Sequence, residues 1–117
     1  MAPNRLRRWA LMLGEWCAIL QIEKPPRLEF VPPRRMPQRV AMLTEYYLAI
    51  EEGWVIKIST APMDDPEEDF VHELLHVKTG CTDQAHEPWI RALAAALVAL
   101  KRRSGTYDSA VTPARLS

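Results

Sequence analysis

Residues 71–80 read V-H-E-L-L-H-V-K-T-G and contain the pattern H-E-x-x-H, formed by His72, Glu73 and His76. On an α-helix, residues four apart are separated by about 40° around the axis and by about 6 Å along it. The two imidazoles therefore project from one face, close enough to bind one metal ion. Glu73 stands beside them, where a carboxylate can act as a base on a water molecule. The stretch predicts a metal site built on a helix.

Two simpler interpretations compete with this one. The histidines could lie on a solvated helix face with no metal, or they could hold a structural zinc ion without catalysis. The chain has three histidines in 117 residues, and all of them fall between His72 and His86. Random placement rarely gives such clustering, so the sequence favours a metal-binding site.

The ends of the motif helix are also encoded in the sequence. Asp65 suits the N-cap, Pro66 suits the first helical position, and Gly80 suits the left-handed residue that follows a helix. An apolar stripe turned toward a core recurs at helical spacing, formed by Phe70, Leu74 and Val77. These signals predict a helix over Pro66–Thr79.

A catalytic zinc ion usually takes three protein ligands and a water molecule. His86 lies ten residues beyond His76, near enough along the chain to be the third ligand. Glu87 is the alternative, since carboxylates also bind zinc. Asp83 and Cys81 are weaker candidates. A cysteine thiolate such as that of Cys81 would suit a structural zinc site better than a catalytic one.

The remaining elements follow from periodicity and from proline and glycine. We expect a helix over residues 4–21, a strand over Arg27–Val31 and a strand over residues 54–59. Residues 40–50 could be a helix or a strand, and we favour a strand forming a hairpin with the next one. A last helix is expected over residues 88–103, ended by Ser104 and Gly105. The fold class is α+β in one domain, residues 1–103, with a flexible tail over residues 104–117.

Composition sets limits on the class of protein. Apolar residues make up 48% and charged residues 26%, and fifteen basic residues balance fifteen acidic ones, so net charge gives no reason to expect nucleic acid or a membrane surface. Two distant cysteines suggest no disulfide framework. Neither a signal peptide nor a membrane span is recognisable. We expect a cytoplasmic protein without nucleic-acid or membrane partners; the sequence leaves the oligomeric state open.

The pattern V-H-E-L-L-H, followed after nine residues by H-E-P-W, resembles the SprT-like and YgjP-like small zincins, and the element order is similar to the minigluzincins. The resemblance implies a minimal zincin core: an N-terminal helix, a small, mostly antiparallel three-stranded sheet, the H-E-x-x-H helix and a C-terminal helix. It also implies Zn²⁺ on His72, His76 and His86, with Glu73 as general base. A small residue commonly follows the third histidine in these families, whereas this chain has Glu87. No zinc ribbon or basic extension follows, so repair of DNA–protein crosslinks is not expected.

The resemblance predicts a zinc metallopeptidase, a hydrolase of peptide or protein substrates. In such folds the strand before the motif helix is the sheet edge that pairs with substrate, which here implicates Val55, Lys57 and Ser59. Candidates for stabilising the oxyanion are Tyr46, Tyr47, Arg91 and Tyr107. One alternative is a zinc-bearing binding or regulatory module without peptidase activity. The other is a latent protease whose tail or dimer partner covers the zinc.

Overall fold

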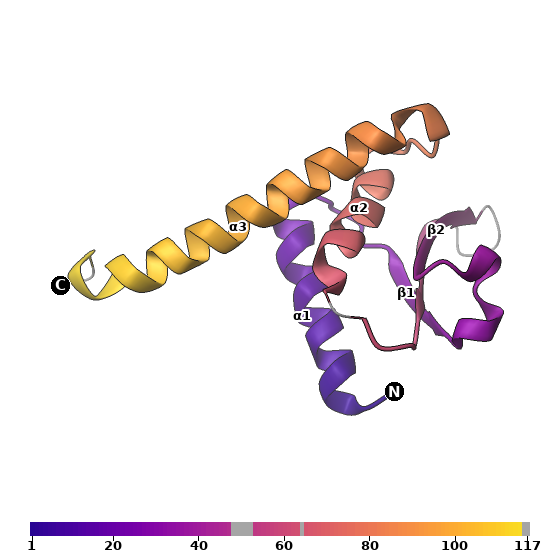
Figure 1. Ribbon diagram of the computed structural model, residues 1–117, viewed down its shortest axis with the longest axis horizontal. Coiled ribbons are helices and arrows are strands. Elements are labelled where there is room, and N and C mark those ends of the chain that lie inside the picture. Colours follow the sequence, from indigo (N-terminus) through magenta and orange to yellow (C-terminus); the bar gives the residue numbers. More distant parts are fainter. Residues whose placement is uncertain (48–52, 64, 116–117) are drawn as a thin grey trace.

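The computed structural model describes residues 1–47, 53–63 and 65–115, with side chains described at 1–46, 53–63 and 65–104. The fold is α+β, as predicted (Figure 1). In chain order its elements are α1 (Pro3–Leu20), β1 (Arg27–Val31), the short 3₁₀ turns η1 (Pro33–Arg35) and η2 (Pro37–Arg39), β2 (Met42–Tyr47), β3 (Gly53–Ser59), α2 (Pro66–Thr79), η3 (Gln84–His86) and α3 (Glu87–Arg115).

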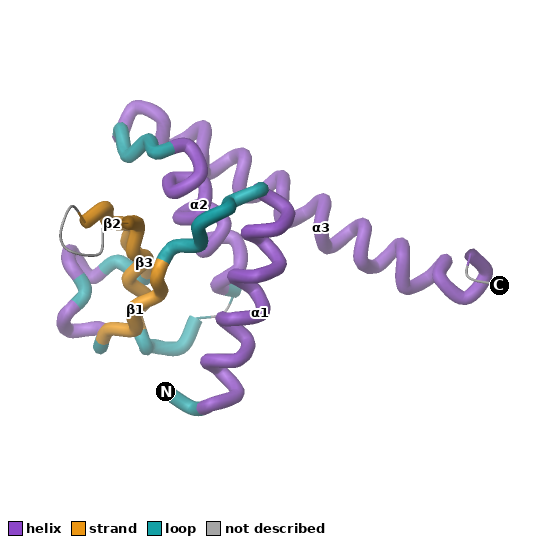
Figure 2. The backbone as a smooth tube through the Cα atoms, turned by 180° about the vertical axis from the view of Figure 1, so that it is seen from behind, coloured by secondary structure: helices purple, strands orange, loops and turns teal. Residues whose placement is uncertain are grey.

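The three strands form one mixed sheet in the order β1-β3-β2 (Figure 2). β1 runs parallel to β3, with Leu28 opposite Ile56, and β2 runs antiparallel to it, with Thr44 opposite Ile56. The predicted hairpin is therefore confirmed over its strands, while residues 48–52 lie outside the described part. One of the two strand pairings is parallel, so the sheet is mixed and not mostly antiparallel. The connection after β1 carries the chain past the position of β3 to β2, and β3 then runs between them in the direction of β1.

One face of the sheet forms the core together with the helices. Successive strand residues point to opposite faces, so Ile56 and Ile58 share a side, and both are fully buried. Helix α2 lies on this face with Phe70, Val71 and Leu74 fully buried, between the sheet and α3 (Figure 1). Burying each such side chain contributes about 1.5–3 kcal/mol, so the core fixes where α2 presents its histidines.

Helix α2 has the predicted limits, and Gly80 ends it with φ 68° in the left-handed region. Asp65 occupies the N-cap position, but its carboxylate makes no cap hydrogen bond. It accepts instead from Arg102 of α3 at 2.8 Å. This partner comes from the last helix, 37 residues away, and local pattern alone could not have indicated it.

Helix α3 begins at Glu87, one residue before the expected start, and runs on to Arg115 instead of ending near Arg103. The expected stop at Ser104 and Gly105 was wrong because a single glycine costs only about 1 kcal/mol in a helix and need not end it. A mobile tail over residues 104–117 stays a prediction. Within the described residues, none of the helices combines the length and apolarity needed to cross a membrane.

Glu67 joins all three helices. Its carboxylate accepts a hydrogen bond from Trp16 Nε1 of α1 at 2.8 Å and contacts Lys101 and Arg102 of α3. Trp16 is fully buried, and the Lys101 ammonium lies 5.4 Å from the centre of its ring. Burial alone would raise the pKa of Glu67, but the hydrogen bonds from Lys101 and Trp16 outweigh it and lower that pKa.

Replacing Glu67 with alanine is expected to lower the free energy of unfolding by about 2–4 kcal/mol, because Trp16 and Lys101 lose a shared partner in a mostly buried place. Because the folded pKa is lowered, the ionic stabilisation is present above the ordinary value of 4.5 and is lost as pH falls through the folded pKa. Urea unfolding at neutral and acidic pH measures both effects.

Glu68 provides the matched control. It lies next to Glu67 on α2 but is exposed, so Glu68→Ala should change stability by less than about 0.5 kcal/mol. Equal losses in the two variants would contradict the assigned role of Glu67.

Candidate metal centre

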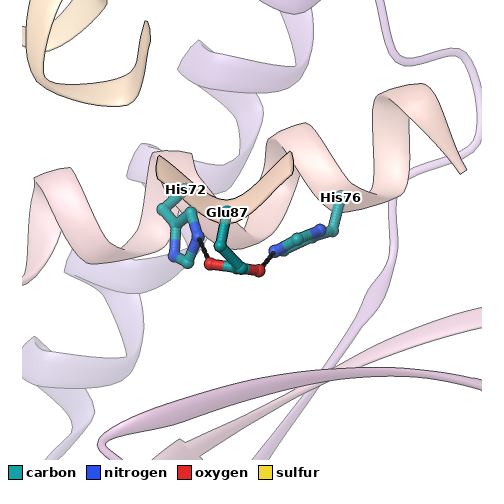
Figure 3. Close-up of side chains that lie close together, drawn as sticks. All are labelled: His72, His76 and Glu87. Carbon is teal, nitrogen blue, oxygen red and sulfur yellow. Dashed lines mark hydrogen bonds and ion pairs between the residues drawn. The ribbon is translucent and has the colours of Figure 1, made fainter. Parts of the chain in front are cut away.

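Two histidines and one glutamate meet where α2, α3 and the edge of β2 come together. His72 and His76 are both buried, and their ring centres lie 4.9 Å apart. Glu87, the first residue of α3, lies between them (Figure 3), with Oε2 2.7 Å from His72 Nε2 and Oε1 2.7 Å from His76 Nε2. One ligand atom from each residue lies within 4.8 Å of the others, so the group could hold a metal ion.

The outer nitrogens of both rings face acceptors as well. His72 Nδ1 lies 3.1 Å from Glu73 Oε2, and His76 Nδ1 lies 2.6 Å from the carbonyl oxygen of Cys81. A neutral imidazole donates from one nitrogen, and neutral rings can make the hydrogen bonds of His72 Nε2 to Glu87 and of His76 Nδ1 to Cys81. Protonation of both rings, or a cation in place of the two Nε2 protons, would also satisfy the ion-pair contacts with Glu73 and Glu87. Exchanging two protons for one divalent cation leaves the local charge unchanged, and the donor set therefore fits such an ion.

The spacing approaches that of a zinc site without equalling it. Zinc–ligand distances of 2.0–2.2 Å in a tetrahedron put neighbouring ligand atoms about 3.4 Å apart. The two contacts of Glu87 are shorter, at 2.7 Å, and are made by different oxygens, while the three ligand atoms lie within 4.8 Å of one another. Both the carboxylate and the rings would therefore have to shift to hold one ion. Nitrogen and carboxylate oxygen are ligands that zinc accepts, and three protein ligands leave a fourth position for water.

Charge in the site follows from these contacts. The hydrogen bond to Glu73 contributes most to a raised pKa of His72, against burial and with help from Glu87. Burial alone would raise the pKa of Glu87, but the hydrogen bonds and charges of His72 and His76 lower it overall. Glu87 is therefore a carboxylate at neutral pH, as a metal ligand must be.

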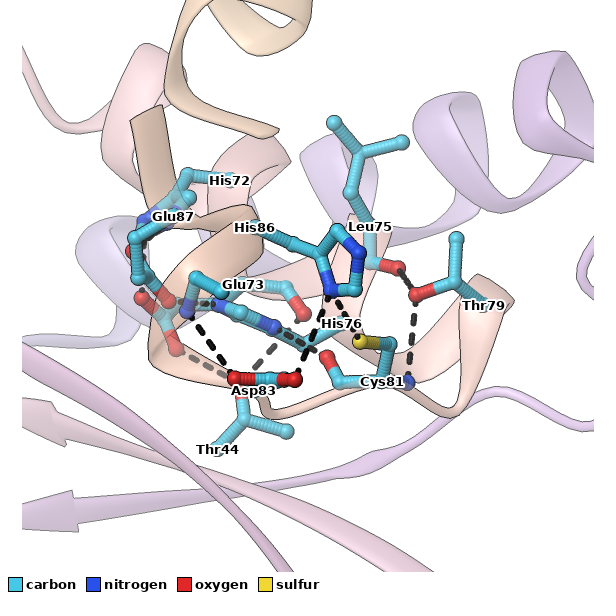
Figure 4. A network of polar contacts seen from close by, with 11 residues as sticks. Thr44, His72, Glu73, Leu75, His76, Thr79, Cys81, Asp83, His86 and Glu87 are labelled. Atoms are coloured by element: carbon cyan, nitrogen blue, oxygen red, sulfur yellow. Dashed lines mark hydrogen bonds and ion pairs between the residues drawn. The ribbon is translucent and has the colours of Figure 1, made fainter. Parts of the chain in front are cut away.

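Glu73 is held from its other side by the sheet. Thr44 of β2 donates from Oγ1 to Glu73 Oε1 at 2.7 Å (Figure 4). Thr44 was missed by sequence reasoning, because its contact with Glu73, 29 residues further along the chain, depends on how α2 packs on the sheet. The pairing of β2 with β3 puts Thr44 opposite the buried Ile56, so the available signal was a polar residue on the inward face of a strand.

A cavity of about 550 Å³ adjoins this group. Its walls include His72, Glu73, His76 and Glu87, along with Thr44 and other residues of β2. Asp69, Thr82, Gln84 and Arg91 also line it and are exposed, so the cavity is reached from the surface. Of the residues that the sequence offered as oxyanion stabilisers, Arg91 lies in the cavity wall. The side chains of Tyr47 and Tyr107 lie outside the described part.

The structure does not bring His86 to the group. Its Nδ1 lies 3.3 Å from Cys81 Sγ and 3.9 Å from Asp83, and its side chain is 57% exposed. Because consecutive helical residues are turned by about 100°, Glu87 and His86 cannot both face the α2 histidines. The structure groups Glu87, and not the preferred His86, with the two α2 histidines; Glu87 is the alternative that the sequence had left open.

The expectation that the strand before the motif helix is the sheet edge was wrong. β3 is the central strand, and both of its backbone edges pair with neighbours. Val55 is buried, Lys57 pairs with Glu45 at 2.9 Å, and the Ser59 hydroxyl accepts from Ala61 N. The sheet edge beside the candidate centre is β2.

Comparisons of the chain with family models, with curated proteins and with solved structures gave no significant match. The geometry of the candidate centre therefore carries the functional argument.

Proposed function

We propose that this protein is a zinc-dependent peptidase in which His72, His76 and Glu87 hold the ion and Glu73 is the general base. The observation that carries the proposal is the convergence of three ligand atoms within 4.8 Å, next to a second carboxylate and an accessible cavity. The glutamate as third ligand agrees with the gluzincin-like alternative within the resemblance to small zincins.

Zinc, when bound, supplies a Lewis acid that polarises a carbonyl and makes a water molecule more acidic. Glu73 accepts the proton of the attacking water and then gives it to the leaving amine. Its carboxylate is buried beside both His72 and Thr44, which fix its position. Arg91 lines the cavity wall, and its guanidinium would stabilise negative charge that develops on the substrate.

An extended peptide would bind by adding a strand to β2. Within the described residues, the side of β2 away from β3 pairs with no strand, and residues of β2 line the cavity. Main-chain hydrogen bonds along such an edge provide affinity that is independent of sequence. We therefore propose residues 42–46 as the substrate-binding strand in place of Val55, Lys57 and Ser59.

The direct test is hydrolysis of a mixed peptide library by the purified protein, followed by mass spectrometry. Cleavage should require zinc, stop on chelation and return when zinc is added. A protein that binds zinc stoichiometrically but leaves the library intact would contradict the peptidase proposal.

A metal-binding module without peptidase activity is the second candidate, and one observation favours it. Both oxygens of Glu73 already have partners, Thr44 and His72. A carboxylate held this way could orient His72 and take no part in proton transfer. The library experiment separates the two candidates.

Thr44 gives a prediction of its own. Replacing it with valine removes the hydroxyl at nearly constant volume, so Glu73 loses one of its two fixed contacts. We expect kcat to fall about tenfold, since misplacement of a catalytic group slows the reaction, while KM and zinc affinity change little. Steady-state kinetics and a zinc competition assay measure these quantities.

Thr44→Ser is the control, because it restores the hydroxyl and should recover most of the activity. A valine variant as active as the wild type would show that Thr44 does not position Glu73.

A further inference from the structure

A second cavity, of about 510 Å³, lies at the N-terminal end of β2. It shares two wall residues, Val40 and Ala41, with the cavity of the candidate metal centre. The two hollows therefore adjoin along the edge that precedes Met42. A peptide that lies along β2 and extends from the metal centre past Met42 would reach this second cavity.

The second cavity is positively charged. Arg34 and Arg39 line it, and among the described residues its walls contain no carboxylate; the remaining residues are Pro33, Val40, Ala41, Ser59, Ala61, Pro62 and Met63. Both arginines are exposed. Neither has an acidic partner within the described part of the chain, whereas Arg102 is paired with Asp65. We call this hollow the basic pocket.

The loop that carries Arg39 has a defined backbone. Gln38 and Arg39 have φ of 54° and 58°, in the left-handed region that residues other than glycine seldom adopt. The loop is held by hydrogen bonds from Arg39 N to Met36 O and from Val40 N to Pro37 O, and the Met36 side chain is buried. Unfavourable backbone conformations of this kind persist where the surroundings fix them, and they often occur at binding sites.

We propose that the basic pocket binds a carboxylate of the substrate on the C-terminal side of the cleaved bond, so that the enzyme prefers acidic peptides. The proposal rests on the proposed peptidase function. Antiparallel pairing is the more stable arrangement of two strands. A peptide antiparallel to β2 runs from Tyr47 toward Met42, and its C-terminal residues then reach Val40 and Ala41.

The distance limits where the carboxylate can be. Val40 lies four residues before Thr44, two of them preceding β2, which is about 13 Å when the chain is extended at the usual strand rise. An acidic side chain within about four residues of the bond, or the carboxylate of a short peptide's C-terminus, would thus meet Arg34 and Arg39. Guanidinium groups bind carboxylates through paired, charge-assisted hydrogen bonds.

The test measures binding of fluorescent twelve-residue peptides to the zinc-loaded Glu73→Ala protein and to its metal-free form, so no step depends on catalysis. One peptide has glutamates in its C-terminal half, a second has glutamines there, and a third has the glutamates in its N-terminal half; all three are amidated. A glutamine peptide with a free C-terminus isolates the terminal carboxylate. We expect the first peptide to bind about tenfold more tightly than the second at low salt.

Arg34→Gln/Arg39→Gln should remove this preference. Arg7→Gln/Arg103→Gln, which changes two exposed arginines outside the basic pocket, should retain it. Equal affinity for glutamate and glutamine peptides, a preference that survives Arg34→Gln/Arg39→Gln, or a preference for glutamates in the N-terminal half would each overturn the proposal. Absence of cleavage by the wild type beside a preserved binding preference would overturn the peptidase function and leave the acidic preference standing.

Discussion

Replacing Glu73 with alanine is expected to reduce peptide hydrolysis by about 10²- to 10⁴-fold, the usual contribution of a general acid–base group. Zinc content should stay near that of the wild type, because Glu73 is not one of the three converging ligands. The variant loses the group that takes the proton from water, while His72, His76 and Glu87 remain. Hydrolysis of the library peptides, with zinc measured on the same preparation, tests both parts.

The alanine variant also removes a buried acceptor from Thr44 and His72, so lost activity could reflect local disorder. Glu73→Gln keeps the shape and an acceptor oxygen but cannot take up a proton, and it should be about as inactive as Glu73→Ala. Glu68→Ala, an exposed change on the same helix, should be fully active. An active Glu73→Gln enzyme would reassign the base and favour a role for Glu73 in orienting His72.

Much of the site was predictable from the sequence because its main element is defined by local signals. Proline at the start, glycine at the end and an apolar stripe gave the limits of α2, and the four-residue spacing of His72 and His76 gave their common face. These features depend on neighbours within a few residues. The strand over residues 54–59 followed in the same way from its β-branched residues, and it is close to the observed Gly53–Ser59, whereas residues 40–50 had been left open between helix and strand.

The remaining features depend on contacts between distant segments. The order β1-β3-β2, which makes β2 the edge, arises from a parallel pairing that no local pattern encodes. The partner of Asp65 is 37 residues away. A shift of one residue in the start of α3 decides whether His86 or Glu87 faces the α2 histidines. Helix limits predicted from sequence alone are uncertain by at least one residue.

That one-residue difference leads to the second large expected effect. Replacing Glu87 with alanine should weaken zinc binding by more than about 100-fold, beyond the 10–100-fold that loss of an outer partner of a metal ligand costs. His86→Ala should leave the affinity within about threefold, since its ring contacts Cys81 and Asp83 and does not face the α2 histidines. Competition for zinc with a chromogenic chelator measures the affinities.

Glu87→Gln refines the comparison, because it keeps the size of the side chain but removes the charge that balances His72 and His76. It should bind zinc more weakly than the wild type and more tightly than Glu87→Ala, since an amide oxygen is a poorer zinc ligand than a carboxylate. The opposite ranking, with His86→Ala the weakest binder, would mean that the start of α3 turns by one residue when zinc binds. Glu87 would then contact the histidines only in the metal-free protein. The zinc ligands would be His72, His76 and His86, as the resemblance to the small zincins implies.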